Sequence, residues 1–357
     1  MALTASAQLA GGMKLEQFDP AAGAAEVRAC HEIYLAGHPI DDPYGPPMSA
    51  RYFAGWLTLG WTEDPQEVWL ARDSQGGPRG CYLLGLPHRE NQHLAMLWPM
   101  VHPAHRRTGL GCALVRHAAG RARQSGRTVL SGWARDGSPG SAFAAAIGAR
   151  PGITQVGRVL RLRDLPAGRL AALRAQAEPA ARGYALLSWD GPAPEQLIGG
   201  LAAINTSAFA DMPRDAGQEG QRWDETRVRL DERRIAAQGL RWYTVAARSL
   251  ASAELAAFTQ LAVDPAEPSW GLQELTAVAR PHRGHRLGLL VKVAMLELLA
   301  GREPQLTQVI TGNADANQHM IAINAQLGFE VLDEWPSWEL DVPRALAARR
   351  QAVSVTS

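Results

Sequence analysis

The stretch Val101-His-Pro-Ala-His-Arg-Arg-Thr-Gly-Leu-Gly111 returns, little changed, as Val278-Ala-Arg-Pro-His-Arg-Gly-His-Arg-Leu-Gly288, 177 residues further along the chain. Each stretch follows an apolar run typical of a β-strand and precedes an apolar run typical of a helix. A strand, a basic loop that contains glycine and a helix therefore occur twice. This repeat predicts that one anion-binding unit was duplicated, and it points to both the fold class and the ligand.

The chemistry of the two loops favours a phosphate ligand. Backbone N–H groups at the start of a helix lack partners within the helix and carry the positive end of its dipole. Glycine lets a phosphate approach these donors closely, and the arginines add positive charge. Neither loop has the Gly-x-Gly-x-x-Gly spacing of a dinucleotide-binding fold or the Gly-Lys-[Ser/Thr] of a P-loop.

The loops resemble the [Arg/Gln]-x-x-Gly-x-[Gly/Ala] segment that holds the pyrophosphate of coenzyme A (CoA) in the GNAT superfamily of acyl-CoA-dependent N-acyltransferases. Arg106 to Gly111 matches this pattern in full, whereas Arg283 to Gly288 has Arg286 in place of the first glycine. Further on, Asn313, Asn317 and Leu327-Gly-Phe329 resemble the later CoA-facing strand and helix of the family. The resemblance covers nearly the whole chain, as in tandem members of the mycothiol synthase and antibiotic acetyltransferase types.

The resemblance implies an α/β protein with two tandem GNAT-like domains, each a mixed twisted sheet flanked by helices. The expected divisions are a flexible leader at 1–12, a first domain at 13–165, a linker helix at 166–183, a second domain at 184–345 and a frayed tail at 346–357. The two domains are called here the first and the second copy.

Acetyl-CoA or a related short acyl-CoA is the ligand that the resemblance implies. In the second copy, the backbone of Ala277, Val278 and Ala279 is expected to pair with the pantetheine arm. The pyrophosphate and the neighbouring parts of CoA are expected to contact Arg283, Gly284, His285, Arg286, Leu287, Gly288, Asn313 and Asn317. The first copy retains the matching residues Val101, Arg106, Arg107, Gly109 and Gly111, which could still hold CoA.

The second copy also carries a candidate general base. Several family members place a strand glutamate nine residues before the leading Arg or Gln, where it takes a proton from the attacking amine. That position is Glu274 in the second copy and Leu97 in the first. A carboxylate among apolar strand residues should be partly desolvated, which would raise its pKa. The alternative is that Glu274 lies on the outer surface of an edge-like strand.

The candidate acid departs from the family pattern. Many relatives carry a tyrosine in Tyr-x-x-x-Gly-Phe that protonates the departing CoA thiolate, and Asn324 stands there in this chain. An amide can hydrogen-bond a thiolate but cannot supply a proton at neutral pH. Asn324 is therefore expected either to contact the thiolate or only to hold CoA, and the first copy has Ala144 in its place.

Composition sets limits on partners. The chain has 36 Lys and Arg against 35 Asp and Glu, a net charge of +1, which gives no reason to expect nucleic acid or anionic membrane as a partner. Its 3 cysteines show no metal-ligand spacing, and it has no long apolar run. We expect a cytoplasmic enzyme, monomeric or homodimeric, without a metal, that acts on an amine of a small molecule or peptide.

Three rival hypotheses remain open from the sequence. The first copy could be the catalytic one, because its loop is the better match. The chain could bind CoA without catalysis, as a regulatory module. An O-acyltransferase or a thioester-dependent peptide modifier would share every motif.

Overall fold

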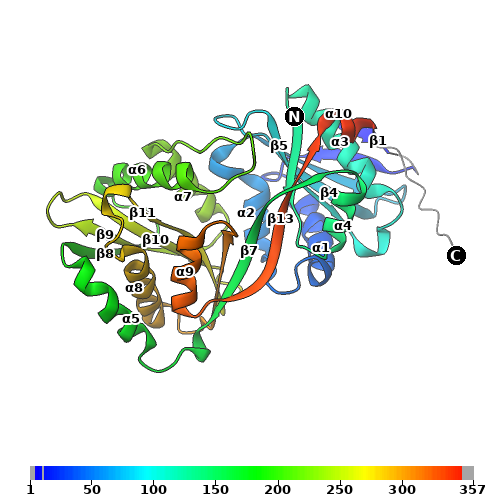
Figure 1. The fold of residues 1–357 in the computed structure, drawn as a ribbon. Coiled ribbons are helices and arrows are strands. Elements are labelled where there is room, and N and C mark those ends of the chain that lie inside the picture. Colours follow the sequence, from blue (N-terminus) through cyan, green and yellow to red (C-terminus); the bar gives the residue numbers. More distant parts are fainter. Residues whose placement is uncertain (1–4, 10–11, 348–357) are drawn as a thin grey trace. The chain divides into compact units, whose positions relative to one another are not determined.

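The computed structural model describes residues 5–9 and 12–347, which form two compact units. Unit 1 comprises the described residues of 1–43, 56–152 and 335–357, and unit 2 comprises residues 44–55 and 153–334. Each unit is a twisted sheet with helices on both faces (Figure 1).

In the sheet of unit 1, β5 and β6 are parallel, whereas β1 with β2, β2 with β3, β3 with β4, β4 with β5 and β6 with β13 are antiparallel. In spatial order its strands are β1 (Ser6–Gln8), β2 (Lys14–Phe18), β3 (Gln66–Arg72), β4 (Pro78–Gly85), β5 (Leu94–Val101), β6 (Val129–Trp133) and the end of β13 (Glu330–Asp341). Its helices are α1 (Ala24–Asp41), the end of α2 (Ala50–Thr58), α3 (Leu110–Gln124), α4 (Pro139–Ala146) and α10 (Val342–Ala347).

Successive side chains of β4 point to opposite faces of the sheet and so pack against the helices on both sides of unit 1. Cys81 is fully buried beside Cys30 of α1. Tyr82 points the other way, and its hydroxyl lies 2.7 Å from Nδ1 of His117 in α3.

Unit 2 repeats this arrangement with β11 and β12 as its parallel pair. After the first residues of β13, its strands are β7 (Arg150–Arg161), β12 (Gln308–Ala314), β11 (Trp270–Val278), β10 (Leu255–Val263), β9 (Arg241–Ser249) and β8 (Tyr184–Asp190). Helices α6 (Glu195–Asp211) and α7 (Glu225–Ala237) lie on one face of the sheet. Helices α5 (Arg169–Ala177), α8 (Leu287–Arg302) and α9 (Gln318–Leu327) lie on the other (Figure 1).

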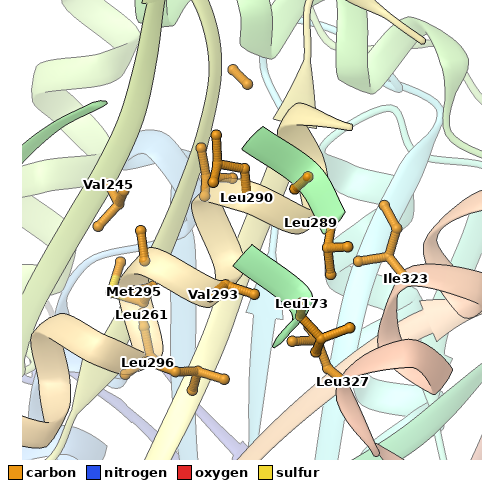
Figure 2. Close-up of a cluster of buried hydrophobic side chains, with 14 of the residues drawn as sticks. Leu173, Val245, Leu261, Leu289, Leu290, Val293, Met295, Leu296, Ile323 and Leu327 are labelled. Atoms are coloured by element: carbon orange, nitrogen blue, oxygen red, sulfur yellow. The ribbon is translucent and has the colours of Figure 1, made fainter. Parts of the chain in front are cut away.

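The main core of unit 2 surrounds α8. All residues from Leu287 to Leu296 are buried, because the helix packs on the sheet and is covered by its neighbours. Figure 2 shows Leu289, Leu290 and Val293 of α8 among Val245 and Leu261 of the sheet and the leucines of α5 and α9. A helix that is apolar on all sides is expected only where it is enclosed in this way.

The compact units do not coincide with the expected halves 13–165 and 184–345. Strand β7, from the first half of the sequence, lies in unit 2 beside β12. The end of β13, from the second half, lies in unit 1 beside β6. β7 and β13 are both long strands that can pair with the open edge of β6 or of β12. The repeated loops therefore do not reveal which half of the sequence supplies this strand to each unit.

Two smaller expectations also need correction. Within the expected leader 1–12, Ser6–Gln8 is a strand that pairs with β2, so this part is ordered; residues 1–4 and 10–11 lie outside the described part. The expected linker at 166–183 contains α5, but Leu173 and Ala177 pack into the core of unit 2. In the expected tail, residues 346–347 belong to α10, and the rest lies outside the described residues.

Candidate active site

The parallel strands of unit 2 separate in the middle, and this leaves an open edge at the candidate site. β11 pairs with β12 only from Trp270 to Leu272, although β11 continues to Val278. In unit 1, β5 and β6 likewise pair only from Leu94 to Met96. We call the splayed region of unit 2, between β11 beyond Leu272 and β12 beyond Ile310, the wedge.

The backbone groups of the stretch expected to pair with pantetheine alternate in direction. The N–H of Ala279 donates to the carbonyl of Ala256 at 2.8 Å, on the side of β10. Because backbone groups alternate in direction along a strand, the N–H of Ala277 also points to β10, and those of Thr276 and Val278 point toward the wedge. Of the three residues expected to pair with pantetheine, only Val278 offers its N–H there.

The loop after the wedge has the same backbone conformation in both copies. In unit 1 the left-handed positions are Arg107 (φ 65°) and Gly109 (φ 90°). In unit 2 they are Gly284 (φ 84°) and Arg286 (φ 55°). The copies therefore exchange which of the two positions is glycine, and Arg286 keeps the turn that the missing glycine would have made.

The leading arginine of each loop forms an ion pair at the end of a helix, a contact that the sequence did not suggest. Arg106 donates to Asp41, the last residue of α1; its Nη1 lies 2.9 Å from Oδ1 of Asp41. Asp211, the last residue of α6, accepts from both Arg280 and Arg283. The hydrogen bond from Arg280, with a further one from Arg283, lowers the pKa of Asp211 to about 2.

Arg283 is therefore already paired, and its side chain ties the loop to α6. The positive charge that remains in the loop comes from Arg286 together with the backbone N–H groups at the start of α8.

The last glycine of each motif serves helix packing. A Cβ added to Gly288 would lie 3.0 Å from Cδ1 of Ile323 in α9, and one added to Gly111 would lie 3.3 Å from the ring of Phe143 in α4. These glycines let the helix that follows the loop approach its neighbour.

Glu274 lies at a β-bulge. Thr259 pairs with Thr276 and Leu261 with Gln273, so two steps along β10 correspond to three along β11. Glu274 and Leu275 therefore share the place opposite Gln260, and bulges of this kind re-aim side chains beside active sites. In unit 1, β4 and β5 keep a continuous register, and Leu97 simply pairs with Leu84.

The environment of Glu274 combines access with desolvation. Its side chain remains accessible to solvent, yet burial among the surrounding protein atoms raises its pKa. Arg234 of α7 lowers this pKa and Asp231 raises it, both by less than the burial. A carboxylate that water reaches from one side, with protein atoms on the others, has a raised pKa because its charged form is less well solvated.

Asn324 lies in the interior and not at the wedge. It is fully buried, its Oδ1 accepts from Nζ of Lys292 at 2.7 Å, and its Nδ2 donates to Oδ1 of Asn313 at 2.6 Å. Asn313 is half-buried on β12. Lys292 was not among the residues predicted from the sequence, although a lysine inside the apolar run of α8 was a visible signal.

Two further candidate ligand residues are already bonded within the protein. Oδ1 of Asn317 caps α9 by accepting from the N–H of Met320 at 3.3 Å. Nδ1 of His285 lies 3.1 Å from the carbonyl oxygen of Ala180.

The described residues contain no cluster of His, Cys, Asp and Glu that could hold a metal ion. Among the same residues, no helix is long and apolar enough to cross a membrane.

Comparison with known proteins agrees with this geometry. Residues 27–139 match the model of the acetyltransferase (GNAT) family. A mycothiol acetyltransferase of Kineococcus radiotolerans is 33% identical over 64% of this chain and 67% of its own. One from Mycolicibacterium paratuberculosis is 31% identical over 67% of this chain and 71% of its own.

Among solved structures, a tandem GNAT protein from the clavulanic acid biosynthesis pathway matches with a TM-score of 0.76 and 27% identity, over 92% of this chain and 98% of the other. A GCN5-related N-acetyltransferase from Sphaerobacter thermophilus shares the fold, with a TM-score of 0.61 and 16% identity over 94% of this chain and 97% of its own.

Proposed function

This chain belongs to the GNAT family of acetyltransferases, and from this premise we propose that the second copy transfers an acetyl group from acetyl-CoA to a primary amine. One observation carries the choice of copy. Glu274 is a carboxylate with a raised pKa at a bulge of the strand that borders the wedge. The corresponding strand of the first copy has Leu97 and no bulge.

The proposed reaction begins with deprotonation of the amine. An ammonium has no lone pair, so Glu274 takes a proton from the amine, directly or through water. The amine nitrogen then bonds to the thioester carbon, and the carbonyl π electrons move to the oxygen. The N–H groups of Val278 and Thr276 point into the wedge, where they are available to stabilise this negative charge.

Collapse of the intermediate completes the transfer. The carbonyl re-forms, the C–S bond breaks, and its electron pair leaves on sulfur. The nitrogen, positively charged after the attack, gives its extra proton to solvent. The thiolate takes up a proton from solvent or from the acid form of Glu274, and the products are an amide and CoA. The pyrophosphate is held by the backbone of the loop from Arg283 to Gly288, with Arg286 adding charge.

The acceptor that we propose is a small-molecule amine of the mycothiol type. Two mycothiol acetyltransferases that align with about two thirds of this chain support this choice over a peptide. Thiol release from acetyl-CoA should be measured against a panel of amines: the amine precursor of mycothiol, an amino sugar, a polyamine and a peptide with a free N-terminus. The proposal predicts the fastest turnover with the mycothiol precursor. Acetyl-CoA binding without thiol release for any amine would contradict it.

A second candidate assigns catalysis to the first copy. Its loop matches the motif in full, and the family model aligns with residues 27–139. In that case Gly109→Trp would abolish turnover, and Glu274→Gln would leave it intact.

A further inference from the structure

Three polar side chains are linked by hydrogen bonds in a row that runs from the core of unit 2 to the wedge. Lys292 of α8 is only 2% exposed, and Asn324 of α9 is fully buried. Asn313, the third member, is half-buried on the part of β12 that has separated from β11. The nitrogen of Lys292 also lies 5.1 Å from the centre of the Phe329 ring.

Lys292 determines which atom donates and which accepts in these hydrogen bonds. The ammonium form of Lys292 only donates hydrogen bonds, so in that form the oxygen of Asn324 faces it, at 2.7 Å. The amide nitrogen of Asn324 then faces Asn313 and donates to its oxygen at 2.6 Å. This leaves the N–H groups of Asn313, which donate to no other group among the described residues, for a ligand.

The duplication supplies an internal comparison. When the last glycines of the two loops are aligned, Val115 corresponds to Lys292. Ala144 corresponds to Asn324, since the carbonyl of each accepts from the N–H five residues later. The strand registers place Ala134 opposite Asn313. The copy that lacks the glutamate therefore also lacks all three polar groups.

Keeping a lysine in this core is costly. Burial disfavours the charged form and lowers the pKa of Lys292 to about 7. The apolar residues of the first copy show that the same fold is built without the lysine. A role in packing alone does not account for it.

We propose that Lys292 is a positioning residue for acyl transfer: through Asn324 it orients the amide of Asn313, whose N–H groups stabilise the departing thiolate of CoA. This inference rests on the proposed function, because it places the sulfur of CoA at the wedge of unit 2. When the C–S bond breaks, its electron pair stays on sulfur, and a hydrogen bond from Asn313 lowers the energy of that anion.

The direct test is the titration of the thiol of bound CoA, which requires no acceptor. Ultraviolet absorbance of the thiolate is followed against pH, with CoA lacking its sulfur as the blank. The proposal predicts a thiol pKa about one unit lower in the wild-type complex than in free CoA. Asn313→Ala and Lys292→Met should each return it to the free value, and the double variant should show no further change.

A repacked variant separates positioning from folding. Lys292→Met combined with Asn324→Leu imitates the apolar core of the first copy and removes both buried polar partners together. It should unfold at a temperature close to that of the wild type, and the thiol pKa should remain at the free value. A wild-type thiol pKa in this stable variant, or equal pKa values in wild type and Asn313→Ala, would overturn the proposal.

Turnover gives a second readout. With acetyl-CoA and an accepted amine, Asn313→Ala should lower kcat about 10- to 100-fold with little change in KM for acetyl-CoA. This loss of kcat should be smaller with a thioester whose thiol is more acidic than that of CoA. If the pKa of the bound thiol is lowered as predicted but no amine is acetylated, the proposed function is refuted and the role of Asn313 at the thiolate is not. Failure of unit 2 to bind CoA would refute both.

Discussion

At the scale of single residues, Glu274 shows how its surroundings raise the pKa of an ordinary carboxylate. Sequence spacing located the residue, and its apolar neighbours predicted a raised pKa. The bulge that aims the side chain was not predictable, because it depends on the pairing register with β10. The same limit explains why Asn324 was expected at the thiolate: its contacts with Lys292 and Asn313 arise from tertiary packing.

The raised pKa of Glu274 predicts the acid limb of the pH–rate profile. A general base works only when deprotonated, so kcat/KM should rise with pH through an apparent pKa above the ordinary glutamate value. Glu274→Gln should lower kcat/KM about 100-fold or more and remove this limb. Initial rates of thiol release across pH check this. A limb at the ordinary glutamate value, or one that persists in the variant, would contradict the assignment.

Lys292 makes a prediction about stability. Its pKa is about 7 in the folded protein and near 10.4 in the unfolded chain. Between these values the unfolded chain binds a proton that the folded protein does not, so the free energy of unfolding should rise with pH, by at most about 1.4 kcal/mol per pH unit.

Denaturant titrations of wild type and Lys292→Met over this pH range give the measurement. The difference between the two proteins should grow in favour of the wild type as pH rises. A difference independent of pH would show that Lys292 is not desolvated as described.

At the scale of elements, the loop and its helix were the most predictable part of the fold. The strand, loop and helix of each copy follow local sequence signals, and the structure has all of them. The left-handed conformation of Arg286 was not foreseen, because only comparison of the two backbones shows that glycine and arginine have exchanged positions. The Asp211 ion pairs were also missed, since they join residues about 70 apart in sequence.

Substitutions at Arg286 test whether backbone shape or side chain holds the diphosphate. Arg286→Gly satisfies the left-handed φ of 55° and should bind CoA within about tenfold of wild type. Arg286→Val removes the same charge but places a β-branched residue where it is strained by about 1–3 kcal/mol. Calorimetric titration with CoA should therefore show much weaker binding for valine than for glycine. Equal losses would mean that the charge of Arg286 dominates.

At the scale of the whole molecule, duplication explains both what could be read from the sequence and what could not. Two similar loops predicted two copies of one fold, and each compact unit has that fold. The exchange of β7 and β13 between the expected halves was not predictable, since either copy could supply an equivalent last strand. Under the proposed function, duplication leaves the first copy free to differ at the active site, where it has Leu97 and Val115.

The most direct test of the account is the turnover of three single variants, one in the second copy and two in the first, with acetyl-CoA and the best acceptor from the amine panel. The account predicts that Glu274→Gln loses at least about 100-fold in kcat/KM, whereas Leu97→Gln, in the other copy, stays close to the wild type. Wild-type turnover by Glu274→Gln, together with loss of turnover in Gly109→Trp, would place the chemistry in the first copy and contradict the account.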